Sequence, residues 1–153
     1  MTPAIRHKEF RFPVAVAWDE GRLTTARVVG KPPLRIATPP EFRGTNSDVW
    51  SPEDALMGAV GSCLAVTIVA MAERDELPLR SLSVHAEGFV GRRADGRFGF
   101  VRIEQTVTLE TDADQEDAAR EVVARAEDGC LVTASLDLPV QTIVDVRTTA
   151  RAG

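Results

Sequence analysis

The sequence predicts an α+β fold with a mostly antiparallel sheet, and three observations support this prediction. Stretches that alternate apolar and polar residues, typical of half-buried strands, come in pairs separated by short turns. Two helical patterns divide these pairs, which gives the element order ββ–α–ββ–α–β. The chain has 153 residues, of which 44% are hydrophobic and 27% charged, so we expect one folded domain over residues 1–153.

The N-terminal part predicts a hairpin followed by a proline-rich loop. Residues 10–18, FRFPVAVAW, alternate as a half-buried strand does, and residues 22–29, RLTTARVV, follow the turn DEG as the returning strand. Four prolines lie between Pro32 and Pro40. Because proline lacks the amide hydrogen that helices and sheets use, we expect an ordered loop there.

A long uncharged helix is predicted between Ser51 and Pro78. Ser51 is a good N-cap, Pro52 suits the first helical position, and Asp54 stands where a capping box has an acid. The 18 residues Ala55–Ala72 carry no charge. This length approaches that of a membrane span, but the run is rich in small residues, has acids at both ends and lies in a chain without Tyr. We therefore expect a buried helix, packed in a core or at a subunit interface.

Gly58, Gly61 and Ser62 predict that another backbone comes close to this helix. Each glycine costs about 0.5–1 kcal/mol in a helix interior relative to alanine, and such positions are usually tolerated at close approaches. One small domain has little material to bury every side of a long helix. A second copy of the chain is the natural cover, so we expect a homodimer.

The second half of the chain predicts three further strands and two helical segments. The strands are expected at residues 82–90, 98–111 and 140–148. Residues 112–129 form an amphipathic pattern, and Gly129 is placed to end that helix in a left-handed cap. Residues 130–139, CLVTASLDLP, predict a short helical piece before the last strand.

Charge and composition argue against several classes of partner. The formal net charge is −5, and no run of Lys or Arg is longer than Arg92-Arg93. Binding to nucleic acid or to an anionic membrane needs concentrated positive charge, so we expect neither. The first 16 residues contain no apolar signal core, which favours a cytoplasmic protein.

The chain is poor in metal ligands. Its Cys and His residues are Cys63, Cys130, His7 and His85, scattered along the sequence without the short spacings of a zinc site. We therefore expect no metal. In a reducing compartment, the two cysteines are expected to be free thiols.

Each cysteine alone is most simply a small buried apolar residue. The helix dipole does not activate Cys63, because that dipole acts within about the first turn and Cys63 lies roughly 15 Å past the helix start. A reactive Cys63 would need a cation from elsewhere, for which Arg is suited. Together, Cys63 and Cys130 suit a cysteine peroxidase, in which one thiol attacks and the other resolves.

Two motifs resemble those of the OsmC/Ohr superfamily of osmotically inducible and organic hydroperoxide resistance proteins. SPEDALMGAVGSCLAVT, residues 51–67, is similar to the family's Pro-Glu pair followed by a small-residue helix with a Cys. AEDGCLVTASLDLPV, residues 126–140, resembles the second motif, in which another Cys opens a short helix. The upstream PPEFRG loop and the order of the motifs agree, and the resemblance covers roughly residues 10–147.

The resemblance implies an OsmC-like fold, in which mostly antiparallel sheets wrap around the long central helices of an intertwined homodimer. It implies that Cys63 attacks the O–O bond of an organic hydroperoxide and becomes a sulfenic acid. Cys130 would then form a disulfide with Cys63, and an external dithiol would reset the enzyme without a cofactor. The expected function is thus a thiol-dependent peroxidase of the oxidative stress response.

The resemblance also implies an Arg and a Glu at the site. Glu53 matches the Glu, although in one straight helix it would lie about 15 Å from Cys63. Either the helix start is broken, or the partner subunit supplies Glu53; otherwise Glu53 is simply a first-turn acid. Arg22 is the nearest match to the Arg of the family's early hairpin. Rivals in the same region are Arg27, Arg35 and Arg43.

The sequence departs from the hydroperoxide-resistance branch at two places. Ser51 stands where that branch carries Asn, and MGAVGSC lacks the aromatic residues found near the attacking Cys. The chain is closer to the general OsmC-like group, so the alternative is a non-catalytic dimer that binds a small apolar ligand at its interface. An acyl-transfer enzyme using Cys63 is weaker, because neither His85 nor His7 is an obvious base.

Overall fold

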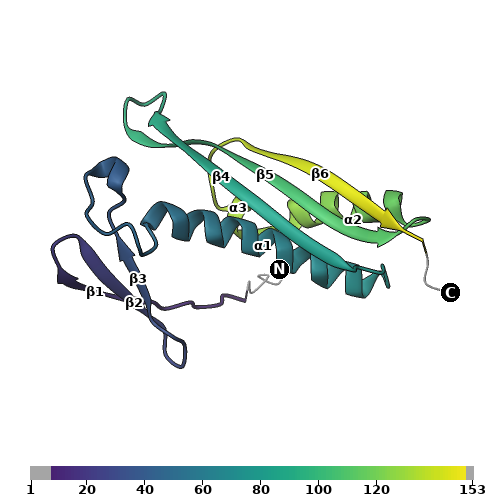
Figure 1. Ribbon diagram of the computed structural model, residues 1–153, viewed down its shortest axis with the longest axis horizontal. Helices are drawn as coiled ribbons and strands as arrows, with labels where there is room; N and C mark the ends of the chain where they lie inside the picture. The colour runs from purple at the N-terminus through teal and green to yellow at the C-terminus, as the bar shows by residue number, and fades with distance from the viewer. Residues whose placement is uncertain (1–7, 151–153) are drawn as a thin grey trace, which may run out of the picture. The chain divides into compact units, whose positions relative to one another are not determined.

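The computed structural model describes residues 8–150, which belong to two compact units (Figure 1). The N-terminal unit is Met1–Pro52 and the C-terminal unit is Glu53–Gly153. The single domain over residues 1–153 stays a prediction.

The N-terminal unit is a three-stranded antiparallel sheet. Its strands β1 (Ala15–Glu20), β2 (Leu23–Arg27) and β3 (Leu34–Ala37) lie in that order, and a short 3-10 helix follows at Pro40–Phe42. Gly21 takes a left-handed φ of 51° in the turn between β1 and β2. The predicted hairpin is therefore confirmed, although β1 begins later than expected.

The prediction of a loop through the proline-rich stretch is wrong at β3. The strand occupies the interval between two proline pairs, so all its residues keep their amide hydrogens. It pairs with β2, and the Ala37 amide donates a hydrogen bond to the Trp50 carbonyl at 2.9 Å. The prolines bound this strand; they do not prevent it.

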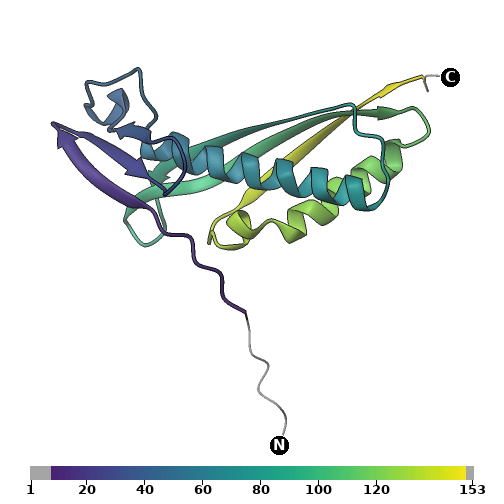
Figure 2. The same cartoon turned by 90° about the horizontal axis from the view of Figure 1, so that it is seen from below.

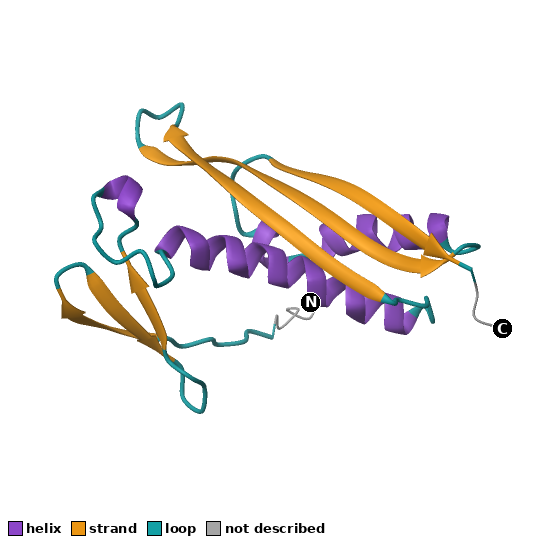
Figure 3. Cartoon of the chain, viewed as in Figure 1, coloured by secondary structure: helices purple, strands orange, loops and turns teal. Residues whose placement is uncertain are grey.

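The C-terminal unit is a second three-stranded sheet with helices on one face (Figures 1 and 2). Its elements are α1 (Pro52–Arg74), β4 (Ser81–Arg92), β5 (Phe98–Asp112), α2 (Glu116–Gly129), α3 (Leu131–Ala134) and β6 (Val140–Thr149). β4 pairs with β5 antiparallel, whereas β5 pairs with β6 parallel through the α2–α3 crossover. Figure 3 shows the resulting mixture of helices and strands, which confirms the predicted α+β class.

The core of this unit lies between the sheet, α1 and α2. Every second residue of β5 is buried from Ile103 to Leu109, as the alternation in the sequence predicts. The fully buried side chains of α1 and α2 complete the layer: Leu64, Ile68, Ala119, Val123 and Ala126. Cys130 belongs to the same cluster, and Cys63 packs against it.

Ion pairs fasten α2 to the end of α1. Asp75, just after α1, accepts hydrogen bonds from Arg125 of α2 and from Arg74, the latter at 3.0 Å. Hydrogen bonds from the Arg125 and Arg74 guanidinium groups hold the pKa of Asp75 below its usual value. This contact ties the C-terminal half of α2 to the C-terminal end of α1.

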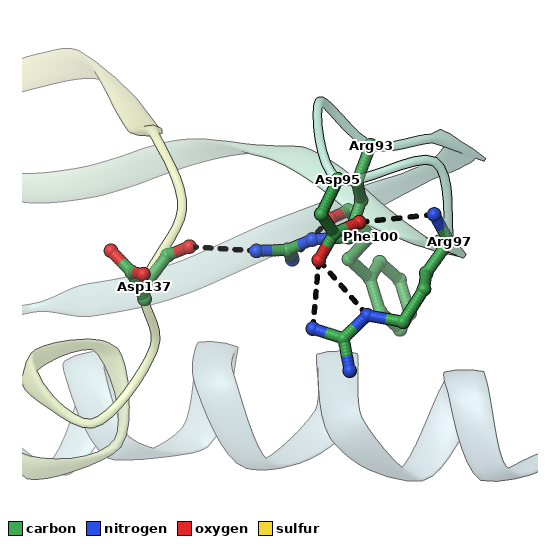
Figure 4. A network of polar contacts seen from close by, with 5 residues as sticks. All are labelled: Arg93, Asp95, Arg97, Phe100 and Asp137. Carbon is green, nitrogen blue, oxygen red and sulfur yellow. Dashed lines mark hydrogen bonds and ion pairs between the residues drawn. The ribbon is translucent and has the colours of Figure 1, made fainter.

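A second network ties the β4–β5 hairpin to the segment between α3 and β6 (Figure 4). The Arg93 guanidinium donates to the Phe100 carbonyl at 3.1 Å and to the Asp137 carbonyl at 3.5 Å. Within the hairpin turn, Arg97 pairs with Asp95 at 2.7 Å and lowers the pKa of that carboxyl group. The segment that follows α3 is thus linked to the sheet.

One face of α1 is apolar and uncovered. Ala59, Ser62, Val66 and Ala70 recur at helical spacing and are all exposed, Val66 by 64%. By length and composition α1 could span a membrane, a test that core helices of soluble proteins also pass. Only 28% of the apolar stretch of α1 is buried, so much of the helix surface is available for packing against another molecule.

Gly61 does not lie on that open face. A Cβ built on Gly61 would lie 3.5 Å from the Ala86 Cβ of β4, which is ordinary contact. The sheet of the same chain therefore accounts for Gly61, and the homodimer must be argued from the exposed face instead.

Alanine substitutions at Gly88 of β4 and Gly61 of α1 should change the free energy of unfolding in opposite directions. At Gly88 of β4, a Cβ would lie 2.4 Å from the Phe100 ring and 2.7 Å from the Met57 sulfur, both of which would have to move. We expect Gly88→Ala to lower the free energy of unfolding by about 1–3 kcal/mol. Gly61→Ala is the matched control and should raise it by about 0.5–1 kcal/mol, because the helix gains and nothing clashes. Urea unfolding of both variants measures this, and equal effects would contradict it.

Candidate functional site

The end of α2 approaches α1 closely enough to bring the two cysteines together. Cys63, Thr67 and Met71 recur every four residues along α1, so they share one face. A Cβ on Gly129 would lie 3.3 Å from the Met71 Cε and 3.9 Å from the Thr67 Cγ2. Gly129 therefore allows the last turn of α2 to rest on this face of α1, and Cys130 follows directly.

The predicted left-handed cap at Gly129 is wrong. Gly129 is the last residue of α2, and its cap is Cys130 with φ −72° and ψ 108°, an extended conformation. Gly129 allows the close approach of α2 to α1 and does not take a left-handed backbone conformation. Because Cys130 is extended, the chain turns at once into α3.

The Cys63 and Cys130 thiols lie within hydrogen-bonding reach of each other, and both cysteines are free. Cys130 is only 1% exposed, whereas Cys63 is half-buried. Burial raises the pKa of the Cys130 thiol, but hydrogen bonds from Thr133, from the Cys63 thiol and from the Val132 amide outweigh burial, so that this pKa lies below its usual value. The thiolate of Cys130 is thus stabilised inside the core.

The short helix α3 supplies these donors. Its first turn places the backbone and hydroxyl groups of Thr133 and the amide of Val132 over the Cys130 sulfur. The turn is held by the Ala134 amide, which donates to the Cys130 carbonyl at 3.0 Å. The Thr133 hydroxyl lies 3.2 Å from the same carbonyl, so its one hydrogen is shared between that carbonyl and the Cys130 sulfur. Thr133 therefore links the position of the sulfur to the fold of α3.

A pocket of about 160 Å³ adjoins Cys130 between the sheet and the end of α2. Its lining residues are Leu64, Gln105, Glu127, Asp128, Cys130, Thr133 and Val140. Gln105 is only 3% exposed, and its Oε1 has no hydrogen-bond partner among the described residues. The side chain opposite it on β6, Thr142, also has a buried and unpartnered oxygen.

Glu53 is the second residue of a continuous α1, so the helix start is not broken. Ten residues of helix separate Glu53 from Cys63, a distance of about 15 Å, and the two do not meet within one chain. The Glu53 Oε2 is buried without a hydrogen-bond partner among residues 8–150. This carboxylate oxygen can accept a donor.

Arg22 belongs to the N-terminal unit, where it lies in the β1–β2 turn and is exposed. Its Nη1 donates to the Phe42 carbonyl at 3.0 Å and to the Arg43 carbonyl at 3.4 Å. Arg22 and Arg43 therefore lie at the same end of that unit. Arg27 lies in β2 and Arg35 in β3.

Metal ligands do not gather in the part of the chain that the structure describes: no three Cys, His, Asp or Glu side chains there could hold an ion together. His85 is exposed on β4, and His7 lies outside the described residues.

Sequence reasoning missed Thr133 and Gln105. The sequence does carry a signal for Gln105, because this polar residue takes an inward position of β5 between the apolar Ile103 and Val107. Thr133 had only its spacing of three residues from Cys130, which one helical turn brings onto the same side.

The fold and the paired thiols define a small α+β protein with a buried two-cysteine site. The sequence model of a family described as OsmC-like protein matches residues 44–145, and the chain belongs to this family. The uncharacterized protein YmaD of Bacillus subtilis is 30% identical over 105 residues, which are 66% of this chain and 69% of that relative.

Solved structures share the fold. An OsmC-like protein of unknown function from Vibrio cholerae has a TM-score of 0.82 at 15% identity and covers 89% of this chain and 99% of its own. An organic hydroperoxide resistance protein from Elizabethkingia anophelis has a TM-score of 0.72 at 15% identity, covering 93% and 100%. These likenesses confirm the predicted OsmC-like fold and, at such identities, speak for the fold alone.

Removing the Thr133 hydroxyl should raise the pKa of Cys130. In a Cys63→Ser background, Cys130 is the remaining thiol, and the substituted hydroxyl keeps a donor beside it. Because a donor to the thiolate favours the charged form, Thr133→Val should move the titration to higher pH, whereas Thr133→Ser should not. The ultraviolet absorbance of the thiolate across pH measures this. Identical titrations in all three proteins would show that Thr133 does not stabilise the thiolate.

Proposed function

We propose that the protein is a thiol-dependent peroxidase that reduces organic hydroperoxides. The observation that carries this proposal is the contact between a half-buried Cys63 and a buried Cys130 whose thiolate is stabilised. A dithiol peroxidase needs one sulfur that a peroxide can reach and a second that can attack the oxidised first one. The pair meets both requirements.

The reaction proceeds in two steps that need no metal or flavin. The Cys63 thiolate attacks one oxygen of the hydroperoxide, the O–O bond breaks, and the alkoxide takes a proton to leave as an alcohol. The Cys130 thiolate then attacks the sulfur of the Cys63 sulfenic acid, and hydroxide leaves as water when it is protonated. The resulting Cys63–Cys130 disulfide is returned to two thiols by an external dithiol, which is itself oxidised to a disulfide.

Arg22 and Glu53 complete the proposed site. A guanidinium group would stabilise the Cys63 thiolate and the oxyanion that develops as the O–O bond breaks. Glu53 would orient that guanidinium, and its buried, unpartnered oxygen supports this role because Arg offers only donors. Since α1 is continuous, we propose that Glu53 serves the Cys63 of a second subunit.

Two uncovered apolar surfaces support the proposed homodimer. One is the exposed face of α1. The other is the edge strand β1 with the segment before it, which expose five large apolar side chains: Phe10, Phe12, Val14, Val16 and Trp18. Large apolar surfaces and open strand edges usually mark interfaces. We propose a cytoplasmic, intertwined dimer in which a second copy covers both.

The name of the Elizabethkingia anophelis relative, organic hydroperoxide resistance protein, supports the choice of substrate class. The sequence identity to that relative is 15%.

Oxidation of the reduced protein by an equimolar amount of cumene hydroperoxide tests the peroxidase. Mass spectrometry of the wild-type protein should show the loss of two hydrogens and a peptide pair linked through Cys63 and Cys130. Cys130→Ser should gain one oxygen at Cys63, because the sulfenic acid has no thiol to react with. Cys63→Ser is the matched control and should stay unmodified.

Thiols that survive peroxide unchanged in all three proteins would overturn the peroxidase. The non-catalytic dimer would then be the better proposal, because the exposed apolar faces support an interface without requiring reactive cysteines.

A charge in the exposed face of α1 should dissociate the dimer. Val66→Glu would bury an unpaired carboxylate in the proposed interface, at a cost of about 3 kcal/mol or more, which weakens the dimer at least about 100-fold. Analytical ultracentrifugation measures the change. Ala124→Glu, at an exposed position of α2, is the control and should leave the dimer intact. A monomeric wild type, or a dimeric Val66→Glu, would exclude this interface.

A further inference from the structure

The pocket beside Cys130 has a polar floor whose hydrogen-bonding capacity is unused. Gln105 forms this floor with a buried oxygen that has no partner among the described residues, and its register partner Thr142 on β6, which lies outside the pocket lining, has another such oxygen. Buried polar groups in folded proteins are nearly always hydrogen-bonded, so such a floor favours an occupant that donates hydrogen bonds. Gln105 lines the pocket itself.

The charged residues of the pocket determine which charge that occupant should carry. Glu127 and Asp128 line the wall at the end of α2, and the lining includes neither Lys nor Arg. Two carboxylates beside an uncharged floor attract a cation and repel an anion. An ammonium group is both a cation and a hydrogen-bond donor, and it therefore fits floor and wall together.

The volume limits the size of the occupant. The pocket holds about 160 Å³, well below the 300–1,000 Å³ of a typical drug-sized site. A molecule of a few heavy atoms fits. Because Cys130 also lines the pocket, such a molecule would lie against this otherwise buried residue.

We propose that this pocket is an entrance to Cys130, separate from the side of Cys130 that faces Cys63. It admits small thiols that carry an ammonium group and disfavours anionic thiols. The entrance is formed within one chain by the sheet, α1 and the α2–α3 turn.

In turnover, an aminothiol in this pocket would reduce the disulfide from the Cys130 side, as an alternative to the external dithiol. Its thiolate attacks the Cys130 sulfur, the disulfide bond breaks, and the electron pair leaves on the Cys63 sulfur, which takes a proton. A second aminothiol attacks the mixed disulfide and releases Cys130 as a thiolate, so that two aminothiols become one disulfide. The donors around Cys130 favour this release, because a stabilised thiolate leaves faster. This role rests on the proposed function, whereas the entrance itself does not.

Labelling of Cys130 in reduced Cys63→Ser protein tests the entrance without any peroxide chemistry. The probes are three methanethiosulfonates of similar size: 2-aminoethyl (cationic), 2-hydroxyethyl (neutral) and 2-sulfonatoethyl (anionic). The Cys130 thiolate attacks the sulfenyl sulfur, a disulfide forms, and methanesulfinate leaves. Second-order rates are followed by mass spectrometry at low ionic strength.

Neutralising the two carboxylates of the pocket wall should change the ratio of the cationic to the anionic labelling rate. We expect Glu127→Gln/Asp128→Asn to lower the ratio of the cationic to the anionic rate at least about tenfold and to leave the neutral rate unchanged. Asp117→Asn/Glu121→Gln is the matched control, because it removes one Asp and one Glu from exposed positions of α2 outside the pocket. In this control the ratio should stay as it was.

Two results would overturn the entrance. One is a labelling rate that does not depend on reagent concentration, because reaction then waits for the protein to open. The other is an equal change of the ratio in both double variants, which would indicate the net charge of the protein and not the pocket. Neither result bears on the oxidation of Cys63 by peroxide, so the entrance and the peroxidase fail separately.

Discussion

Burial of Cys130 is the constraint on which the arrangement of the site depends. A thiolate removed from water is costly unless other groups donate to it. The chain meets this cost locally: Cys130 is extended, α3 begins at the next residue, and the Thr133 and Val132 donors turn back toward the sulfur. The compensation exceeds the cost, since the pKa of Cys130 falls although burial raises it. A buried apolar cysteine with no such donors would be inert.

The packing of the C-terminal unit serves the same contact. α1 can lie flat on the sheet because its run of small residues includes Gly61, which rests on Val84 and Ala86 of β4. α2 can reach α1 because Gly129 has no side chain to hold it away from Met71. Arg125, in the last turns of α2, pairs with Asp75 just after α1 and fastens the two helices together. The meeting of Cys63 and Cys130 thus results from helix packing, and it does not need a disulfide to hold it.

Much of this fold follows from local patterns in the sequence. The alternation of β5 and the amphipathic face of α2 correspond directly to buried positions, and the strand pairs end at turn residues as expected. Local patterns failed where a longer-range contact decides the conformation. β3 forms because β2 and Trp50 offer it partners, and Gly129 lies against Met71, which is 58 residues away in the sequence. The proximity of the cysteines, 67 residues apart, was likewise predicted only through the family resemblance.

The two thiols differ in a way that suits different work. Cys130 has two of its stabilising donors, Thr133 and Val132, next to it in sequence. Cys63 sits mid-helix, beyond the reach of the helix dipole, with one side toward Cys130 and an exposed apolar face of α1 beside it. A cation for Cys63 therefore has to come from another element, and the unpartnered oxygen of Glu53 at the start of α1 is suited to hold one. A self-contained thiolate can resolve whenever its partner is oxidised. A thiol that waits for an external cation can be active only in the assembled protein, and this dependence would couple oxidation to assembly.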